Sequence, residues 1–443
     1  MPKQRPGHPR GLCAVDVIAR KRDGLRVEAE ELHWFVSAYV AGGVAEEEMA
    51  AFLMAVYLRG MELDEVAALT MTMAATGKPV DLSGVPGVKV DKHSTGGVGD
   101  KTTLVVAPLV AAAGAPVAKM SGRALGHTGG TVDKLESIPG LSCEMTAAQF
   151  ARQVKRIGVA VAAQSADMCP ADKRTYALRN RIGAVASIPL IAASVMSKKL
   201  AAGADAIVLD VKCGSGAFMK DLRSARRLAR MMVEIGARAS RPTAALVTDM
   251  SQPLGRAVGN SLEVAEAIEV LRGEGPAEVR ELSLALGARM LVLARVAGGE
   301  REARQRLEQA LASGAALGKF RQMVAAQGGD ARVVDDPARL PRAESEAAAR
   351  APAAGVVRAI ETQAIGEIAH QLMREGGPGA GVTLMKKRGD RVTAGEAVAM
   401  VHGDAGARRA AAEVAGAFDI GQGAPRRRPL VLEVITAGRA AGR

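Results

Sequence analysis

The chain has 443 residues, which is enough for two or three domains with sizeable apolar cores. Hydrophobic residues make up 48% and aromatic residues only 2%, so the cores must consist of Ala, Val, Leu, Ile and Met. The net charge of +12 favours anionic ligands, but aromatic side chains are not interleaved with the basic ones, which argues against a surface for single-stranded nucleic acid.

Cysteine spacing and the first residues predict the compartment. The four cysteines form no CxxC pair and no zinc-binding spacing, so we interpret them as reduced thiols. The opening stretch is charged and proline-rich, unlike a secretory signal peptide. The longest nearly apolar run, residues 104–118, is broken by prolines and a glycine and is too short to span a membrane. We therefore expect a cytoplasmic protein that binds neither membranes nor nucleic acid.

Residues 1–75 predict a small all-helical lobe. Each segment carries an apolar stripe at helical spacing and stops near a glycine, and three segments begin with acidic residues, which favour a helix N-terminus. The expected helices are 15–22, 28–40, 46–58 and 64–75. A later segment, 171–200, has the pattern of two helices separated by Ser187-Ile188-Pro189. We expect residues 170–201 to rejoin and complete this lobe.

From residue 88 onward, short apolar runs alternate with helical patterns. The expected strands are 88–90, 116–119, 159–163, 206–211 and 244–248. Short apolar strands are typical of a parallel sheet that is covered on both faces, and such sheets bind ligands at the carboxyl ends of their strands. We therefore expect a large α/β lobe with a central, mostly parallel sheet, formed by residues 76–169 and 202–335.

The last part of the chain predicts a separate α+β domain. Residues 336–351 are polar with two prolines and are interpreted as a linker. Residues 352–443 contain strand-like runs joined by turn-rich segments, and they resemble the barrel-sandwich architecture of lipoyl and biotinyl carriers. No lysine stands at a plausible hairpin tip, so we expect a structural role for this domain.

The stretch 88–140 contains two similar anion-binding patterns. In each, an apolar run ends at a lysine and a serine, and a glycine-rich loop and a helix start follow. Such loops present backbone N–H groups and a helix N-terminus to an anion. The residues are Lys92 and Ser94 in the first pattern and Lys119 and Ser121 in the second. Neither a P-loop nor a GxGxxG fingerprint is complete, so the pattern supports neither an NTPase nor a dinucleotide enzyme, but it still predicts a site for a phosphate-like ligand.

Four further side chains complete the predicted pocket. His93 lies within the first pattern, where nearby lysines lower its proton affinity and a bound phosphate dianion raises it, so it is a candidate general acid. In the helical segment Ser194 and Lys198 are four residues apart and share one face, and Arg179 follows Tyr176 at a spacing of three. We expect this basic face to enclose a substrate against the phosphate loops.

Six segments together resemble the signatures of the thymidine and pyrimidine-nucleoside phosphorylase family. They are KHSTGGVGD (92–100), SGRALGHTGGTVDKLESIPG (121–140), ADKRTYALR (171–179), SIPLIAASVMSKK (187–199), DVKCGSGAFMK (210–220) and DMSQPLGRAVGN (249–260). The chain is most similar to the bacterial enzymes that accept both uridine and thymidine. The resemblance implies a homodimer without an organic cofactor. It also implies reversible phosphorolysis of pyrimidine nucleosides to free base and (deoxy)ribose 1-phosphate.

The resemblance also implies roles for single residues. Positions that bind phosphate in the family match Lys92, Ser94, Thr103, Ser121 and Thr131, with Lys119 nearby. Positions around the pyrimidine ring match His93, Arg179, Ser194 and Lys198. Arg179, Lys198 and protonated His93 would then stabilise the departing base as its negative charge develops, while phosphate attacks the sugar.

The chain departs from the family at two functional places. Some members bind a potassium ion, at positions that match Gly99, Lys101, Leu254, Ala257 and Glu266. Lys101 stands where the family has a threonine, so its ammonium is a hypothetical substitute for the ion; alternatively, its side chain points away and the ion still binds. The residues after Arg179, at 180–183, also differ from the family, which bears on how Arg179 is held.

Three other functions compete with this prediction. A phosphoribosyltransferase of the same fold would need an acidic magnesium–pyrophosphate site, and no suitable Asp-Glu pair stands beside a glycine-rich loop. A thymidine-specific phosphorylase is the nearest alternative within the family. A basic binding protein without catalysis is disfavoured because His93, Arg179, Ser194 and Lys198 are all present.

Overall fold

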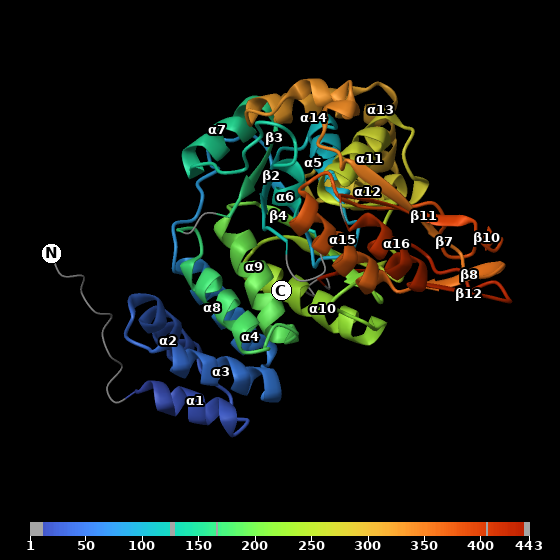
Figure 1. The fold of residues 1–443 in the computed structure, drawn as a ribbon. Coiled ribbons are helices and arrows are strands. Elements are labelled where there is room, and N and C mark those ends of the chain that lie inside the picture. Colours follow the sequence, from blue (N-terminus) through green and yellow to red (C-terminus); the bar gives the residue numbers. More distant parts are fainter. Residues whose placement is uncertain (1–11, 125–128, 165–166, 405, 438–443) are drawn as a thin grey trace.

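The computed structural model describes residues 12–124, 129–164, 167–404 and 406–437, and these form a helical lobe, a large α/β lobe and a C-terminal α+β part (Figure 1). The helical lobe contains α1 (Ala14–Arg22), α2 (Ala29–Ala41), α3 (Glu46–Arg59), α4 (Leu63–Ala75), α8 (Pro170–Arg181) and α9 (Ile188–Ala201). Its core includes Phe35 and Phe52, whose ring centroids are 5.0 Å apart. The later helical segment therefore packs with the first four helices, as expected.

Helix α9 begins inside the segment that was expected to separate two helices. Ser187 is its N-cap, and Ile188 and Pro189 are its first two residues. Proline fits the first turn of a helix because it needs no amide partner there and its φ angle is already helical. The break between α8 and α9 therefore lies before Ser187 and not at the proline.

The central sheet has six strands in the order β13-β5-β4-β1-β2-β3. The strands are β1 (Val90–Ser94), β2 (Val117–Ser121), β3 (Val159–Ala163), β4 (Ala206–Cys213), β5 (Thr243–Asp249) and β13 (Val431–Thr436). Strands β1 to β5 pair in parallel, and β13 pairs antiparallel with β5. All five parallel carboxyl ends therefore lie along one edge, where a ligand site is expected.

Helices cover both faces of this sheet. One core includes Ile207 and Leu209 of β4 and joins α10 (Leu222–Arg238) to the helical lobe. A second core includes Val208 on the opposite face of the same strand. It is completed by α5 (Thr102–Ala112), α11 (Asn260–Arg272), α12 (Ala277–Leu293), α13 (Glu300–Ala312) and α14 (Ala315–Ala326) (Figure 1). This alternation of neighbouring residues between two faces is the expected pattern for a strand buried on both sides.

The first strand extends further than its apolar run predicts. It was expected at 88–90, yet β1 continues to Ser94 through Asp91 and Lys92, which are both buried. The buried charges are paired: Lys199 Nζ donates to Asp91 at 2.8 Å, and Lys92 Nζ lies 3.2 Å from Asp210. Buried ionic groups are tolerated when partners of opposite charge meet them, and those partners are distant in sequence.

The C-terminal part contains two antiparallel sheets and two helices. One sheet has the order β10-β8-β12 and the other has the order β6-β9-β11-β7. The bounds are β6 (Ala257–Val258), β7 (Ser345–Arg350), β8 (Gly355–Ile360), β9 (Gly381–Leu384), β10 (Arg391–Val392), β11 (Ala397–Gly403), β12 (Phe418–Gly421), α15 (Thr362–Gly376) and α16 (Ala407–Gly416).

The observed strand pairing differs from the domain boundaries that were expected from the sequence. The predicted linker 336–351 contains β7, which pairs with β11, so it is only partly a linker. Residues 431–436 were assigned to the C-terminal domain, but β13 returns to the central sheet. Conversely, β6 comes from the α/β segment and pairs with β9. These pairings join strands that are far apart in sequence, so local patterns do not reveal them. In the described part of the chain, no helix combines the length and the apolar character needed to cross a membrane.

Candidate active site

A cavity of about 520 Å³ lies between the carboxyl ends of β1, β2 and β3 and the helices α8 and α9. Residues from α5 and from α6 (Thr131–Leu135) also line it. The predicted site residues in its wall are His93, Ser94, Thr103, Lys119, Ser121, Thr131, Arg179, Ser194 and Lys198. The two groups predicted from separate segments of the sequence therefore face one cavity.

Lys92 is not among the described residues that line this cavity. Its Nζ donates to Thr102 Oγ1 at 2.5 Å and lies 3.2 Å from Asp210. Thr102 is the first residue of α5, so Lys92 supports the start of that helix. The described cation among the phosphate candidates that reaches the cavity wall is Lys119.

The loop after β1 brings its backbone to the cavity. Gly96 and Gly97 both line the wall. Gly96 has a φ angle of 96°, a conformation that favours glycine. At Gly97, a Cβ atom would lie only 2.5 Å from the Met250 side chain. The backbone conformation therefore favours glycine at position 96, whereas a side chain at position 97 would require the end of the Met250 side chain to shift.

The charges near His93 determine its protonation state. Burial and the Lys199 and Lys119 ammonium groups lower the pKa of His93 well below its usual value. Its Nδ1 atom has no hydrogen-bond partner among the described residues. These effects favour the neutral imidazole in the phosphate-free protein, as expected from the nearby lysines, and protonation of His93 with phosphate bound stays a prediction. A neutral imidazole still has one N–H group that can donate to a ligand.

Arg179 is held rigidly at the cavity wall. Its guanidinium donates to the carbonyl oxygens of Ala184 at 3.2 Å, Val185 at 2.5 Å and Leu190 at 3.0 Å. Burial lowers the pKa of Arg179 to about 10, so the group remains charged at neutral pH. Two of the three carbonyls belong to Ala184 and Val185, directly after the segment 180–183, so the departure from the family in that segment does not prevent these contacts.

Lys198 is oriented by two neighbours, one of which the sequence reasoning missed. Its Nζ donates to Ser194 Oγ at 2.7 Å and to Asp172 Oδ2 at 2.6 Å. Asp172 is buried and also lines the cavity. It precedes Tyr176 by four residues and Arg179 by seven, so its position on the same face of α8 was the available signal. Its carboxylate would fix the position of the Lys198 ammonium.

Family models and curated relatives match this architecture. The models are the a/b domain of a glycosyl transferase family (residues 87–317), the helical bundle domain of a glycosyl transferase family (15–77) and a pyrimidine nucleoside phosphorylase C-terminal domain (356–421). The chain is 51% identical to the pyrimidine-nucleoside phosphorylase of Geobacillus stearothermophilus, over 88% of this chain and 91% of the relative. The chain belongs to the pyrimidine-nucleoside phosphorylase family.

Two other pyrimidine-nucleoside phosphorylases show similar agreement. The Bacillus subtilis (strain 168) enzyme is 50% identical over 86% of this chain and 90% of its own length. The Staphylococcus aureus (strain USA300) enzyme is 51% identical over 88% of this chain and 91% of its own length. The anthranilate phosphoribosyltransferase of Thermus thermophilus matches with a TM-score of 0.59 and 22% identity, covering 70% of this chain and 99% of that chain. This last likeness shows the fold alone.

The positions that match the potassium ligands of the phosphorylase family surround the Lys101 side chain. Lys101 Nζ donates to the carbonyl oxygens of Leu254 at 3.0 Å and Ala257 at 2.8 Å, and it pairs with the Glu266 carboxylate. The side chain is fully buried, and the space at these oxygens is taken by the ammonium. The residues present therefore do not fit an additional potassium ion at this place.

The pKa direction of His93 leads to a test of its charge. The folded protein lowers the pKa of His93, so its imidazole should stay neutral as the pH falls through the usual histidine pKa of about 6.5. In phosphate-free protein with labelled histidines, the ring resonance that is lost in His93→Gln should not shift between about pH 8 and pH 5.5. A resonance of His93 that titrates near pH 6.5 would contradict the neutral assignment.

Proposed function

We propose that this chain catalyses reversible phosphorolysis of pyrimidine nucleosides, including uridine, thymidine and deoxyuridine, to the free base and (deoxy)ribose 1-phosphate. The observation that carries the proposal is a single cavity with two chemically distinct walls. One wall has hydroxyls, glycine backbone and Lys119, and the other has Arg179 and Lys198. A phosphate and a pyrimidine base need these two kinds of partner.

The sheet wall would bind phosphate. Ser94, Ser121, Thr103 and Thr131 offer hydroxyl donors to its oxygens, and Lys119 offers a cation. Burial and the nearby Lys199 ammonium lower the pKa of Lys119 well below its usual value. A phosphate dianion would favour the charged form of this lysine, so binding of phosphate and protonation of Lys119 would support each other.

The helical wall would bind the base. Arg179, Lys198 and the Ser194 hydroxyl lie on this wall, and His93 of strand β1 adds a hydrogen-bonding group from the sheet side. Cleavage of the C1′–N1 bond leaves its electron pair on the base, so negative charge develops at the base carbonyl oxygens. Donors held in place by Asp172 and by backbone carbonyls stabilise that charge without reorganising during the reaction.

Phosphate itself completes the bond exchange. As the C1′–N1 bond breaks, the sugar gains positive charge, and a phosphate oxygen forms the new C1′–O bond. The base leaves as an anion and is then protonated. No covalent nucleophile from the protein is required, because phosphate is the nucleophile. The role of the enclosing walls is to orient the two substrates and to exclude water, which would otherwise attack the sugar.

The phosphoribosyltransferase alternative has weaker support. Its basis is a likeness of fold at 22% identity, whereas identity to pyrimidine-nucleoside phosphorylases is 51% over 88% of the chain. We therefore keep phosphorolysis as the proposed reaction. Preference for thymidine alone is tested by the same assay.

The first test is phosphate-dependent release of base. Purified protein is incubated with uridine, thymidine or deoxyuridine, with and without inorganic phosphate, and the free base is measured by chromatography. We expect release from all three nucleosides when phosphate is present. Release from thymidine alone would indicate the specific enzyme, and the absence of phosphate-dependent release from every nucleoside would refute the proposed function.

The second test concerns Lys198. Lys198→Ala removes a donor that would act on the developing base anion, so kcat should fall at least about 100-fold. Calorimetric binding of inorganic phosphate should persist, since Lys198 belongs to the other wall. Lys155→Ala, which changes an exposed lysine on α7 (Ala147–Ile157), serves as the control and should retain normal turnover. Near-normal kcat in Lys198→Ala would remove this residue from the catalytic set.

We also propose that Lys101 replaces the potassium ion that some family members bind. The proposal is supported by the contacts of its ammonium with Leu254, Ala257 and Glu266. An ammonium and a potassium ion carry the same charge, and oxygen atoms bind both of them. The ammonium of a lysine side chain can therefore take over the structural role of the ion.

This proposal predicts that turnover is independent of potassium. Activity measured in potassium-free buffer should not change when potassium chloride replaces sodium chloride at equal ionic strength. Lys101→Thr should lose activity in sodium chloride and recover part of it in potassium chloride. A strict potassium requirement of the unmodified protein would overturn the proposal.

The surface of the helical lobe bears on the assembly of the protein. The helical lobe exposes several large apolar side chains, which are Val15, Leu25, Tyr57, Leu58 and Met71. Leu58 is 72% exposed, which is costly for a leucine in water. We propose that a second copy of the chain covers this lobe in a homodimer and that the enzyme acts in the cytoplasm.

A further inference from the structure

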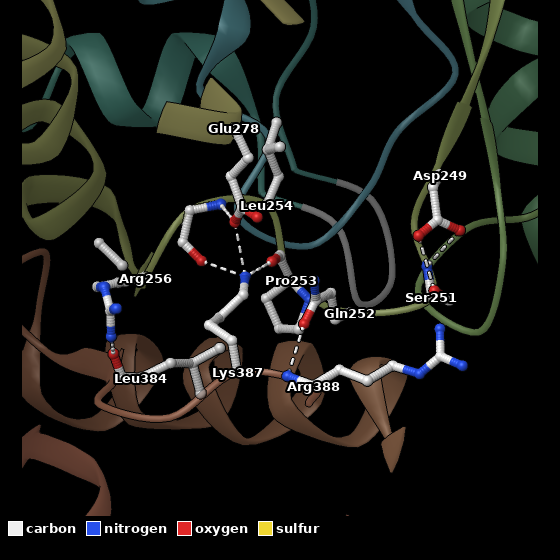
Figure 2. Close-up of polar contacts among 12 residues, drawn as sticks. Asp249, Ser251, Gln252, Pro253, Leu254, Arg256, Glu278, Leu384, Lys387 and Arg388 are labelled. Carbon is white, nitrogen blue, oxygen red and sulfur yellow. Dashed lines mark hydrogen bonds and ion pairs between the residues drawn. The ribbon is translucent and has the colours of Figure 1, made fainter. Parts of the chain in front are cut away.

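A turn of the C-terminal part is fastened to the α/β lobe through one buried lysine. Figure 2 shows Lys387, which follows β9, pointing into the loop that carries Pro253 and Leu254. Its Nζ donates to the carbonyl oxygens of Pro253 at 2.5 Å and Gly255 at 2.7 Å, and it pairs with Glu278 at 2.7 Å. The Lys387 side chain is only 12% exposed, so its ammonium exchanges water for these three oxygens.

The same loop is held from its other side by Lys101. The carbonyls of residues 253 and 255 face Lys387, whereas those of 254 and 257 face Lys101. Two backbone N–H groups of the loop also form hydrogen bonds: Gly255 N–H donates to Glu278, and Arg256 N–H donates to Glu266. The loop between β5 and β6 is therefore fixed by two lysine–glutamate pairs, one lysine from each part of the molecule.

Further contacts tie the two parts together at this place. Arg388 N–H donates to Gln252 at 3.0 Å, and the Arg256 guanidinium donates to the Leu384 carbonyl at 3.2 Å (Figure 2). Strand β6 continues the loop and pairs with β9. These bonds hold the backbone, whereas Lys387 and Glu278 supply a partly buried ion pair.

The loop lies directly against the segment that enters the cavity. Leu254 N–H donates to the Val98 carbonyl at 3.1 Å, and a Cβ atom on Gly99 would lie 2.6 Å from the Leu254 carbonyl oxygen. Lys101 is the N-cap residue of α5. Thr103, in the first turn of that helix, lines the cavity. A shift of the loop would therefore displace the first turn of α5 and its hydroxyl donor.

We propose that Lys387 is a positioning residue for phosphate: by clamping residues 253–257 it holds the start of α5 at the phosphate wall of the cavity. The proposal rests on the proposed phosphorolysis for its enzymatic readout. It also assigns a task to the C-terminal part, which resembles carrier domains but uses this lysine as an anchor and not as an attachment point.

The charge of Lys387 depends on its carboxylate partner. Burial lowers the pKa of Lys387, and Glu278 acts in the opposite direction. Without Glu278, the ammonium would face carbonyl dipoles and the like charge of Lys101. Glu278 and Lys387 should therefore act as one unit.

The test compares two adjacent lysines of the same turn. Lys387→Met keeps a side chain of similar length but removes the ammonium group that contacts residues 253–255 and Glu278. Lys386→Met is the matched control, because Lys386 contacts Arg391 and Glu396 within the C-terminal part and does not reach the loop. We expect Lys387→Met to raise the KM for phosphate about three- to tenfold, the range typical of indirect coupling through a packed network, with little change in the KM for nucleoside. Lys386→Met should leave both constants unchanged.

A direct binding measurement and a milder variant keep the test decisive. The Kd for inorganic phosphate from calorimetry should rise by the same factor in Lys387→Met. If that variant is insoluble, Glu278→Gln should raise the Kd in the same direction. When both variants are soluble, the double variant should bind phosphate no more weakly than Lys387→Met alone. An unchanged Kd for phosphate, even with a lower melting temperature, or an equal rise in both KM values would overturn the positioning role. Absence of phosphate-dependent turnover in the unmodified protein would instead refute the proposed reaction.

Discussion

Paired charges buried within strands β1 and β4 of the central sheet are the constraint on which the site depends. Asp91 lies 2.8 Å from Lys199 and 3.9 Å from Lys119, and Asp210 lies 2.8 Å from Lys212. Removal of one partner would leave an uncompensated charge, at a cost of about 3 to 5 kcal/mol for a buried pair. The network fixes the strand ends and holds several lysines close to the cavity without neutralising all of them.

This arrangement separates two uses of positive charge. Lys92 supports the start of α5 through Thr102 and does not line the cavity. Lys119 lines the cavity on the sheet side, and Arg179 and Lys198 line it on the helical side, where Lys198 also pairs with Asp172. Burial and the nearby lysine charges together lower the pKa of His93, so the pocket disfavours an additional proton there.

The sequence predicts the local parts of this structure well. The bounds expected for β3, 159–163, agree with the structure because a short apolar run and its flanking turns are local signals. The cavity residues were found through loops and helix faces, but Asp172 was missed because its partner Lys198 is on another helix. The full length of β1, the strand β7 and the return of β13 depend on pairings across long separations, which no local pattern encodes. The sequence could name Lys101 but could not decide whether its side chain meets the potassium positions.

The return of β13 gives the chain an order of assembly. This strand covers the edge of β5 and is tied to α10 by an ion pair between Arg226 and Glu433 at 2.7 Å. During synthesis, β5 is made almost two hundred residues before its partner, so its edge stays open until residues 431–436 emerge. An open strand edge is a template for pairing with other chains. Strand β13 therefore protects the edge of β5. A shortened chain without residues 431–436 would keep all the cavity-lining residues, but the edge of β5 would be open to pairing with other chains.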